Sequence, residues 1–193
     1  MNTKNANGGL LQRTLSKAFP TERTAIVAEL LLLTLLGAFA IILRTKLRVP
    51  VNMPGHHGVE VMALLIIGRY VSGISVASSI SGLAAALIMF FPFMGIKDPY
   101  LPVIYLIMGI SIDLLYFAFK DYRKYLALFA LVGGIAYMMI PLSRLVIFGF
   151  TGFPYESFYK FGFFLPFITH FVFGVAGAVL GAGLIYSLNR LKK

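Results

Sequence analysis

The chain of 193 residues contains no cysteine and no tryptophan, and it is poor in charged residues. The absence of cysteine excludes disulfide bonds, thiolate metal sites and cysteine-based catalysis. Charged residues make up only 12% of the chain, whereas soluble domains carry roughly 25%. With 59% hydrophobic residues and a mean hydropathy of +0.88, the composition indicates an integral membrane protein.

Acidic residues are scarce as well, with 7 Asp and Glu against 17 Lys and Arg and a formal net charge of +10. In a soluble protein such an excess would suggest nucleic acid as a partner. Here the charges fall mostly in tails and loops between apolar runs, where they set orientation and contact anionic headgroups. We therefore expect membrane lipids, and no nucleic acid, among the partners.

The common sequence motifs of enzymes are missing too. The chain has no Gly-x-Ser-x-Gly elbow, no His-Glu-x-x-His pair, no phosphate-binding glycine loop and no paired Asp motif. About six spans of ~20 residues account for most of the length, which leaves no room for a separate soluble domain. We expect a protein without catalytic activity and without a resident cofactor.

Six apolar runs predict the fold: an all-α integral membrane protein, a bundle of six transmembrane helices in residues 24–190. A basic tail, residues 1–23, precedes the bundle, and a short basic tail, residues 191–193, follows it. The first tail predicts either a short helix on the membrane surface or a partly disordered segment. The apolar runs are 24–43, 59–68, 72–91, 101–119, 125–150 and 164–188.

The basic residues orient this bundle. With the N-terminus inside, the cytoplasmic pieces hold more than twice as many Lys and Arg as the outer loops. This asymmetry predicts that both termini are cytoplasmic in a multi-pass protein of a prokaryotic plasma or inner membrane. Glu29, near the start of the first run, is interpreted as a residue at the cytoplasmic boundary.

A short polar segment, residues 49–60, lies between the first two runs and on the predicted outer side. Polar and irregular backbone beside a membrane is costly unless it lines or covers a cavity. We therefore predict that this segment binds a small organic molecule through hydrogen bonds. Its candidate binding residues are Asn52, Met53, His56, His57 and Glu60.

Two other interpretations of this segment stay open. His56 and His57 are adjacent, so they point to different sides of a strand or helix and chelate poorly alone. In one alternative, Met53, Glu60 or His170 completes a metal or haem site with them. In the other, the prolines and glycines only shape a loop and the histidines are solvated.

Further ionisable residues fall inside apolar runs, where each must face a neighbouring helix, an interface or water. Asp113 in the fourth run is expected to pair with another polar group or to contact the ligand. Arg144 in the fifth run is expected to bind a carboxylate or phosphate in a bidentate contact, or to form an ion pair with Glu60 or Glu156. His170 in the sixth either contacts the ligand or is a neutral histidine satisfied by a neighbouring hydroxyl or carbonyl.

The aromatic residues, 15% of the chain and all Phe or Tyr, crowd toward the predicted outer side. They predict an interfacial belt or a pocket that stacks on a flat organic ring. Small residues recur at helical spacing in the third and sixth runs, where they let helix backbones approach closely, within the bundle or against another subunit. The candidates for docking on a partner are Gly37, Ala38, Gly73, Ala77, Gly177 and Gly181.

Taken together, residues 24–190 resemble the substrate-binding S components of energy-coupling factor (ECF) transporters, nearest to the biotin-type branch. The likeness lies in the six runs, in a loop punctuated by Pro50 and Pro54, and in an apolar run ending at Gly68 before a run of small residues. A glycine-rich last run with a basic tail is also similar. The chain departs from the family in lacking an Ala-x-x-x-Ala pattern in its first run.

The resemblance implies capture of a vitamin or related micronutrient from the outer side, with the outer loop closing over it. It also implies a membrane coupling subunit and cytoplasmic ATPases as partners. Two other classes of function remain open. One is a metal- or haem-related uptake protein or a membrane enzyme that uses His56, His57 and Glu60. The other is a non-catalytic membrane assembly protein that uses the small-residue ridges.

Overall fold

The computed structural model describes residues 14–15, 18–19, 21–47, 52–119 and 125–191. Within these ranges the chain is helical and contains no strand, which confirms the predicted all-α class. Most of the predicted tails, and Pro50 of the predicted loop, lie outside the described residues. The elements are α2 (Glu22–Lys46), α3 (Gly58–Val71), α4 (Ala77–Met89), the 3-10 turn η2 (Pro92–Met94), α5 (Leu101–Ala118), α6 (Leu126–Thr151), α7 (Glu156–Phe161) and α8 (Phe164–Leu191).

Four helices are long and apolar enough to cross a membrane: α2, α5, α6 and the part of α8 up to Leu188. The second and third apolar runs form shorter helices, α3 with 14 residues and α4 with 13. A span of the hydrocarbon core takes about 20 residues. These two helices are short because the polar connection 72–76 separates them and because α4 ends shortly before Pro92, which begins the turn η2.

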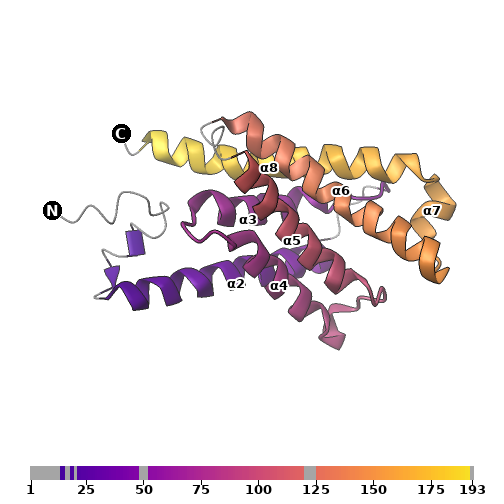
Figure 1. Cartoon of the computed structure of the whole chain (residues 1–193), viewed down its shortest axis with the longest axis horizontal. Helices are drawn as coiled ribbons and strands as arrows, with labels where there is room; N and C mark the ends of the chain where they lie inside the picture. Colours follow the sequence, from indigo (N-terminus) through magenta and orange to yellow (C-terminus); the bar gives the residue numbers. More distant parts are fainter. Residues whose placement is uncertain (1–13, 16–17, 20, 48–51, 120–124, 192–193) are drawn as a thin grey trace.

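The two ends of the bundle are built differently (Figure 1). The start of α2 and the end of α8 lie at one end, which we call the terminal end, together with the connection 72–76. The opposite end, which we call the loop end, carries α7 and the segments 52–57, 92–100 and 152–163. Because successive helices reverse direction, the last turn of α2, the first turn of α3 and the last turns of α6 meet at the loop end.

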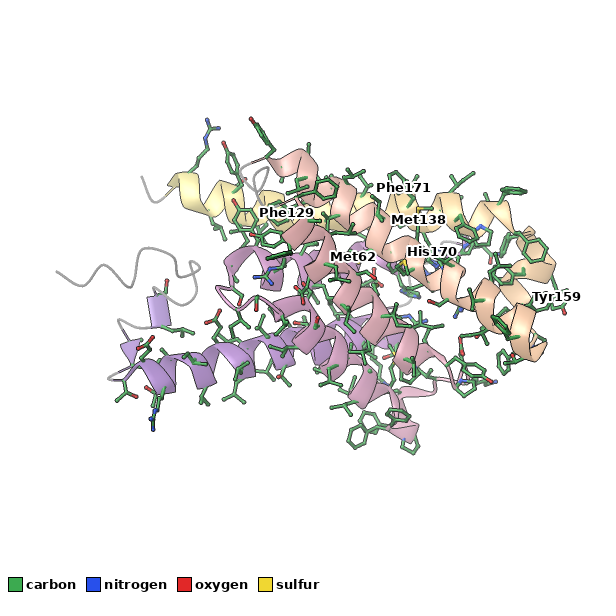
Figure 2. All side chains as sticks on the ribbon, viewed as in Figure 1. Met62, Phe129, Met138, Tyr159, His170 and Phe171 are labelled. Carbon is green, nitrogen blue, oxygen red and sulfur yellow. The ribbon has the colours of Figure 1, made fainter. Side chains whose placement is uncertain are left out.

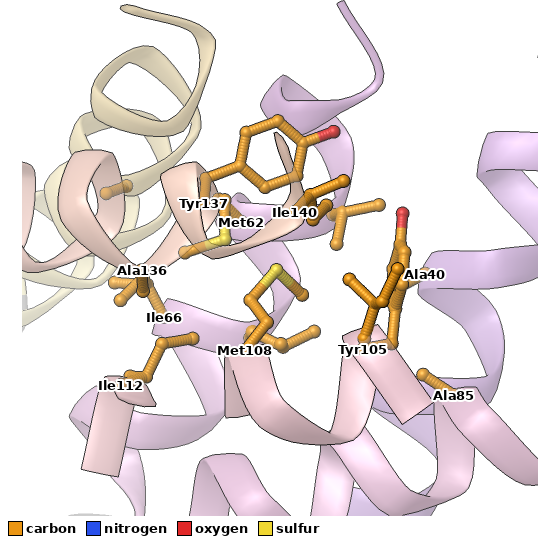
Figure 3. Close-up of a cluster of buried hydrophobic side chains, with 14 of the residues drawn as sticks. Ala40, Met62, Ile66, Ala85, Tyr105, Met108, Ile112, Ala136, Tyr137 and Ile140 are labelled. Carbon is orange, nitrogen blue, oxygen red and sulfur yellow. The ribbon is translucent and has the colours of Figure 1, made fainter. Parts of the chain in front are cut away.

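The core of the bundle is a cluster of buried apolar side chains from α2 to α6 and α8 (Figure 3). Met62, Met108 and Ile112 are completely buried in it. In a membrane such contacts stabilise through close packing more than through removal of apolar surface from water. Tyr105 and Tyr137 lie at the edge of the cluster, with their hydroxyl groups pointing away from Ile112 (Figure 3).

A glycine on α8 allows this helix to approach the first turn of α3. A Cβ atom added at Gly177 would lie 2.5 Å from the carbonyl oxygen of Val59 and 2.6 Å from that of Gly58. Only a residue without a side chain fits between such backbones. This contact positions the start of α3, and the polar segment before it, against α8.

Most of the predicted docking residues are used inside the chain in the same way. Gly37 packs against the backbone of α4, and Gly181 packs against the backbone of α3. Ala77 is also buried. Among the candidates, Gly73 is exposed and Ala38 is half-buried. Gly37, Ala77, Gly177 and Gly181 thus serve packing within the bundle.

Replacing Gly177 with alanine should lower the free energy of unfolding by about 1–3 kcal/mol, because the added methyl group overpacks the contact with α3. Gly183 on the same helix is the matched control, since a Cβ added there meets nothing within 4 Å. Gly183→Ala should be neutral or slightly stabilising. Thermal unfolding in detergent measures both, and equal melting temperatures would contradict the close approach of α8 to α3.

Candidate functional site

Three adjoining cavities, of about 360, 120 and 280 Å³, lie at the loop end of the bundle. Arg144 lines all three of them. Arg44 and His57 line the first two, and His170 lines the second and third. Because the cavities share these walls, we treat them as one candidate site, called the loop-end site.

The segment 52–57 forms one wall of the site because of a glycine turn. Gly55 has a φ of +81°, in the left-handed region that glycine adopts readily and other residues rarely do. A Cβ atom added there would lie 2.7 Å from Nδ1 of His170. The segment therefore turns directly over the His170 ring before α3 begins.

The structure brings together most of the binding residues predicted from the sequence. Only Glu60 and Asp113 do not line the cavities, and Glu60 contacts the site through His57. The predicted residues come from three separate parts of the chain: the segment 52–57, α6 and α8. Those lining the loop-end site are Asn52, Met53, His56, His57, Arg144 and His170.

The two adjacent histidines each have one ring nitrogen engaged within the segment. Nδ1 of His56 lies 2.7 Å from the carbonyl oxygen of Met53, and Nδ1 of His57 lies 2.6 Å from Oε1 of Glu60. Since a carbonyl and a carboxylate only accept, both nitrogens donate, which leaves the other nitrogen of each neutral ring as an acceptor. Among the described residues no group of three His, Cys, Asp or Glu side chains is placed to hold a metal.

His170 is held inside the bundle, near the loop end (Figure 2). Its Nδ1 donates to the carbonyl oxygen of Pro166 at 2.6 Å, and its ring stacks on Tyr137 with centroids 5.0 Å apart. This bond is what the second of the two interpretations of His170, a histidine satisfied by a neighbouring carbonyl, predicts. Because the bond uses only Nδ1, the other ring nitrogen remains an acceptor beside the cavity.

Arg144 pairs with a residue that the sequence did not suggest. Its Nη2 donates to Oδ2 of Asp98 at 3.1 Å, rather than to Glu60 or Glu156. Asp98 lies in the connection before α5, and that connection faces the last turns of α6 at the loop end. The Nε atom of Arg144 is buried and has no hydrogen-bond partner among the described residues.

Tyr155 packs against Arg144, with the guanidinium carbon 5.2 Å from the ring centroid. The hydroxyl of Tyr155 is buried and, among the described residues, has no hydrogen-bond partner. Burial, and to a lesser extent the nearby Asp98 carboxylate, raises the pKa of Tyr155 to about 12. The hydroxyl therefore stays protonated at neutral pH and available as a donor.

Arg44 is a site residue that sequence reasoning missed. As a basic residue on the predicted outer side, it contributed only to the prediction of the orientation in the membrane. It lies in the last turn of α2, half-buried, with its guanidinium carbon 5.3 Å from the ring centroid of Tyr105. Tyr105 and Tyr137 are almost fully buried and line the second cavity with it. The signal that pointed to Arg44 is its place within the last turn of an apolar helix, next to the polar segment.

The charged side chains around the loop-end site are mostly cationic. Arg44, Lys97, Arg144 and Lys160 line the cavities, against Asp98 and Glu156. With histidine nitrogens and backbone as further polar groups, the site offers donors for an anion and acceptors for N–H or O–H groups. Its walls also include aromatic and aliphatic side chains, which suit the apolar body of an organic molecule.

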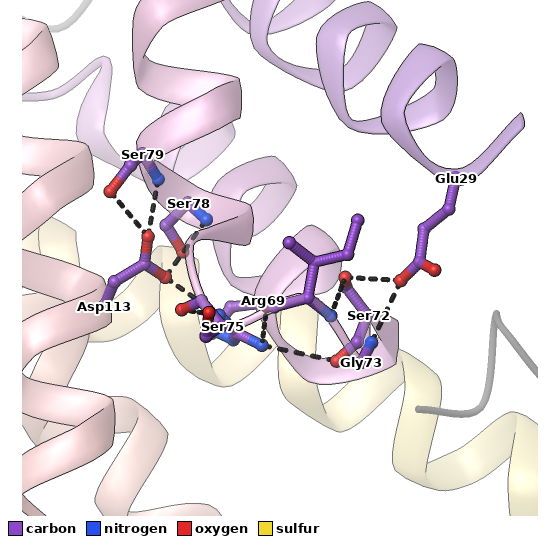
Figure 4. A network of polar contacts seen from close by, with 9 residues as sticks. Glu29, Arg69, Ser72, Gly73, Ser75, Ser78, Ser79 and Asp113 are labelled. Carbon is purple, nitrogen blue, oxygen red and sulfur yellow. Dashed lines mark hydrogen bonds and ion pairs between the residues drawn. The ribbon is translucent and has the colours of Figure 1, made fainter. Parts of the chain in front are cut away.

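Asp113 does not belong to this site but to a buried network toward the terminal end (Figure 4). Its carboxylate accepts from Nη1 of Arg69 at 3.0 Å and from the backbone amides of Ser78 and Ser79 at 3.1 and 2.7 Å. Those amides belong to the first turn of α4, where a carboxylate stabilises the helix start. The sequence predicted that Asp113 pairs with another polar group or contacts the ligand, and in the structure it pairs with polar groups.

The same network holds the connection 72–76. Arg69 donates to three backbone carbonyl oxygens of this connection at 2.6 to 3.3 Å (Figure 4). Glu29 accepts from the hydroxyl of Ser72 at 2.5 Å and from the amide of Gly73 at 2.9 Å. The sequence suggested a boundary position for Glu29, but the side chain is fully buried because it bonds this connection.

No protein-family model, no curated protein and no solved structure matches the chain. The description of the protein therefore rests on its fold and on its polar sites. The described residues form a helical protein with four helices of membrane-spanning length. A group of polar, mostly cationic cavities lies at one end of the bundle, and a buried ion-pair network lies toward the other.

Replacing Asp113 with alanine should lower the free energy of unfolding by about 3–5 kcal/mol, because Arg69 would remain buried without its carboxylate. Ser111→Ala is the matched control, since the Ser111 hydroxyl donates only to the Ile107 carbonyl one turn earlier. Thermal or denaturant unfolding in detergent measures the difference. An Asp113→Ala variant as stable as the control would contradict a structural role for the network.

Proposed function

We propose that the chain is the substrate-binding S component of an ECF-type importer, a non-enzymatic membrane subunit that captures a vitamin or related micronutrient. One observation carries the proposal: binding residues predicted from three distant parts of the sequence line one group of adjoining cavities. Cavities of this total size, with apolar walls and a few polar groups, suit a small organic molecule. The resemblance of the sequence to S components supplies the class of importer.

In this proposal six helices, α2 to α6 and α8, form the membrane domain, and both termini are cytoplasmic. The loop end then faces outward, and the segment 52–57 covers the ligand. The shorter helices α3 and α4 reach membrane depth because irregular backbone is tolerated where protein buries it. In the connection 72–76, where Gly73, Ser75 and Val76 are exposed, Arg69 supplies hydrogen bonds to the backbone carbonyl oxygens.

The proposal assigns distinct roles to the groups of the loop-end site. Arg144 donates to the ligand from Nε, and His57 and His170 accept through their free ring nitrogens. The Gly55 turn over His170 encloses the ligand from the outer side. A membrane coupling subunit and cytoplasmic ATPases would then move the loaded subunit, while this chain supplies binding alone.

Native mass spectrometry of the gently purified protein, together with metal analysis, tests the proposal. We expect an organic molecule of low mass at near-equal stoichiometry, because the cavities combine cationic side chains with apolar walls. Stoichiometric metal without an organic ligand would instead favour the metal-uptake or enzyme alternative based on His56 and His57. A protein that carries nothing, and that no vitamin stabilises in thermal-shift assays, would contradict the proposal.

Arg144→Ala should weaken binding of the co-purified solute by about 10- to 150-fold, the effect of losing one charged hydrogen bond, and His57→Ala by about 2- to 12-fold, the effect of losing a neutral one. Lys46→Ala serves as the control, because Lys46 is exposed in the last turn of α2 and lines none of the three cavities. Isothermal titration measures the affinities, and melting temperatures without ligand show whether each variant is folded. Unchanged affinity in both site variants would refute the assignment of the site.

A further inference from the structure

The two arginines of the loop-end site differ in how their charges are balanced. Arg144 has a carboxylate partner, Asp98, on one of its terminal nitrogens. Arg44 has no carboxylate and no hydrogen bond among the described residues, and its guanidinium faces the ring of Tyr105. A half-buried cation without a counter-ion leaves a local excess of positive charge.

This excess is directed into the site. Arg44 and Arg144 line the same two cavities, the larger one beside the connection 92–100 and the smaller one under the segment 52–57. The ring of Tyr155 packs on the guanidinium of Arg144 and fixes its plane, while Nε is buried and, among the described residues, unbonded. A group bound between these arginines would meet the donors of Arg44, which have no protein acceptor among the described residues, and Arg144, whose Nη2 alone is bonded to Asp98.

The wall of the smaller cavity shows what kind of molecule carries that group. Tyr105, Tyr137, Leu101 and Ile140 line it together with both arginines. Such a wall accepts a flat apolar body, while the planar guanidinium groups match the two oxygens of a carboxylate. A fully hydrated dianion would gain nothing from the apolar part of the wall.

We propose that the ligand of the loop-end site carries a carboxylate, which binds between Arg44 and Arg144 with its apolar body against Tyr105 and Tyr137. This inference rests on the proposed uptake function and narrows it to organic acids. Arg44 is the specificity-determining residue, because Asp98 already balances the charge of Arg144. Neutral analogues, in which an amide replaces the carboxylate, leave the positive charge of Arg44 unbalanced and are rejected.

Benzoate and benzamide form a matched pair of probes, nearly equal in shape and different in charge. In the purified full chain, benzoate at millimolar concentration should raise the melting temperature in a saturable way, and benzamide should not. Arg44→Gln should weaken benzoate binding about tenfold or more, while Arg44→Lys should retain part of it. Lys46→Gln, which removes a neighbouring exposed charge, should bind benzoate as the wild type does.

Equal stabilisation by benzamide, or wild-type benzoate binding by a folded Arg44→Gln variant, would overturn the inference. Stabilisation by inorganic phosphate but not by benzoate would overturn the carboxylate assignment as well. Different results would contradict the organic-acid inference and the proposed uptake function. A neutral solute found by native mass spectrometry would remove the organic-acid inference and leave the uptake role. Discrimination between the two probes, in a protein that captures no solute, would support the site and remove the uptake role.

Discussion

The ion pair between Arg69 and Asp113 is the interaction on which the rest of the bundle depends. It lies between the end of α3, the start of α4 and the last turns of α5, and both side chains are buried. Arg69 also bonds three carbonyl oxygens of the connection 72–76, whose irregular backbone would otherwise lie unsatisfied among apolar helices. The pair therefore holds the chain where it turns from α3 into α4 at the terminal end, and this turn sets the direction of α3 and so the place of the segment 52–57.

Charge is balanced differently at the two ends of the bundle. Toward the terminal end one arginine meets one carboxylate and several carbonyl groups, while the acid also caps a helix. At the loop end Arg44 and Arg144 have a single described carboxylate partner, Asp98. The buried pair of Arg69 and Asp113 contributes to the fold through these bonds, and Arg69 Nε is left without a hydrogen-bond partner among the described residues. The cations that line the cavities of the loop end instead outnumber the carboxylates there.

The sequence predicted the bounds of the long helices well, but it did not predict which charged side chains form ion pairs. The ends of α5 and α6 lie within a residue or so of the predicted runs, because hydropathy along the chain is a local property. Arg69 and Asp113, by contrast, are 44 positions apart, and Arg144 and Asp98 are 46 apart. Which of these meet depends on how the helices face one another, which hydropathy does not encode. The shortness of α3 and α4 has the same origin, since the polar connection between them is stabilised by distant residues.

The packing of α8 and the composition of the site are linked through one helix face. His170 and Gly177 are separated by two helical turns, so both lie on the side of α8 that faces the bundle. Gly177 sets the distance between α8 and the first turn of α3, and His170 contacts the turn at Gly55 just before that helix. A change in the distance between the two helices therefore moves the histidine relative to the segment that covers the cavities. The small residues that build the bundle thus determine the geometry of the loop-end site.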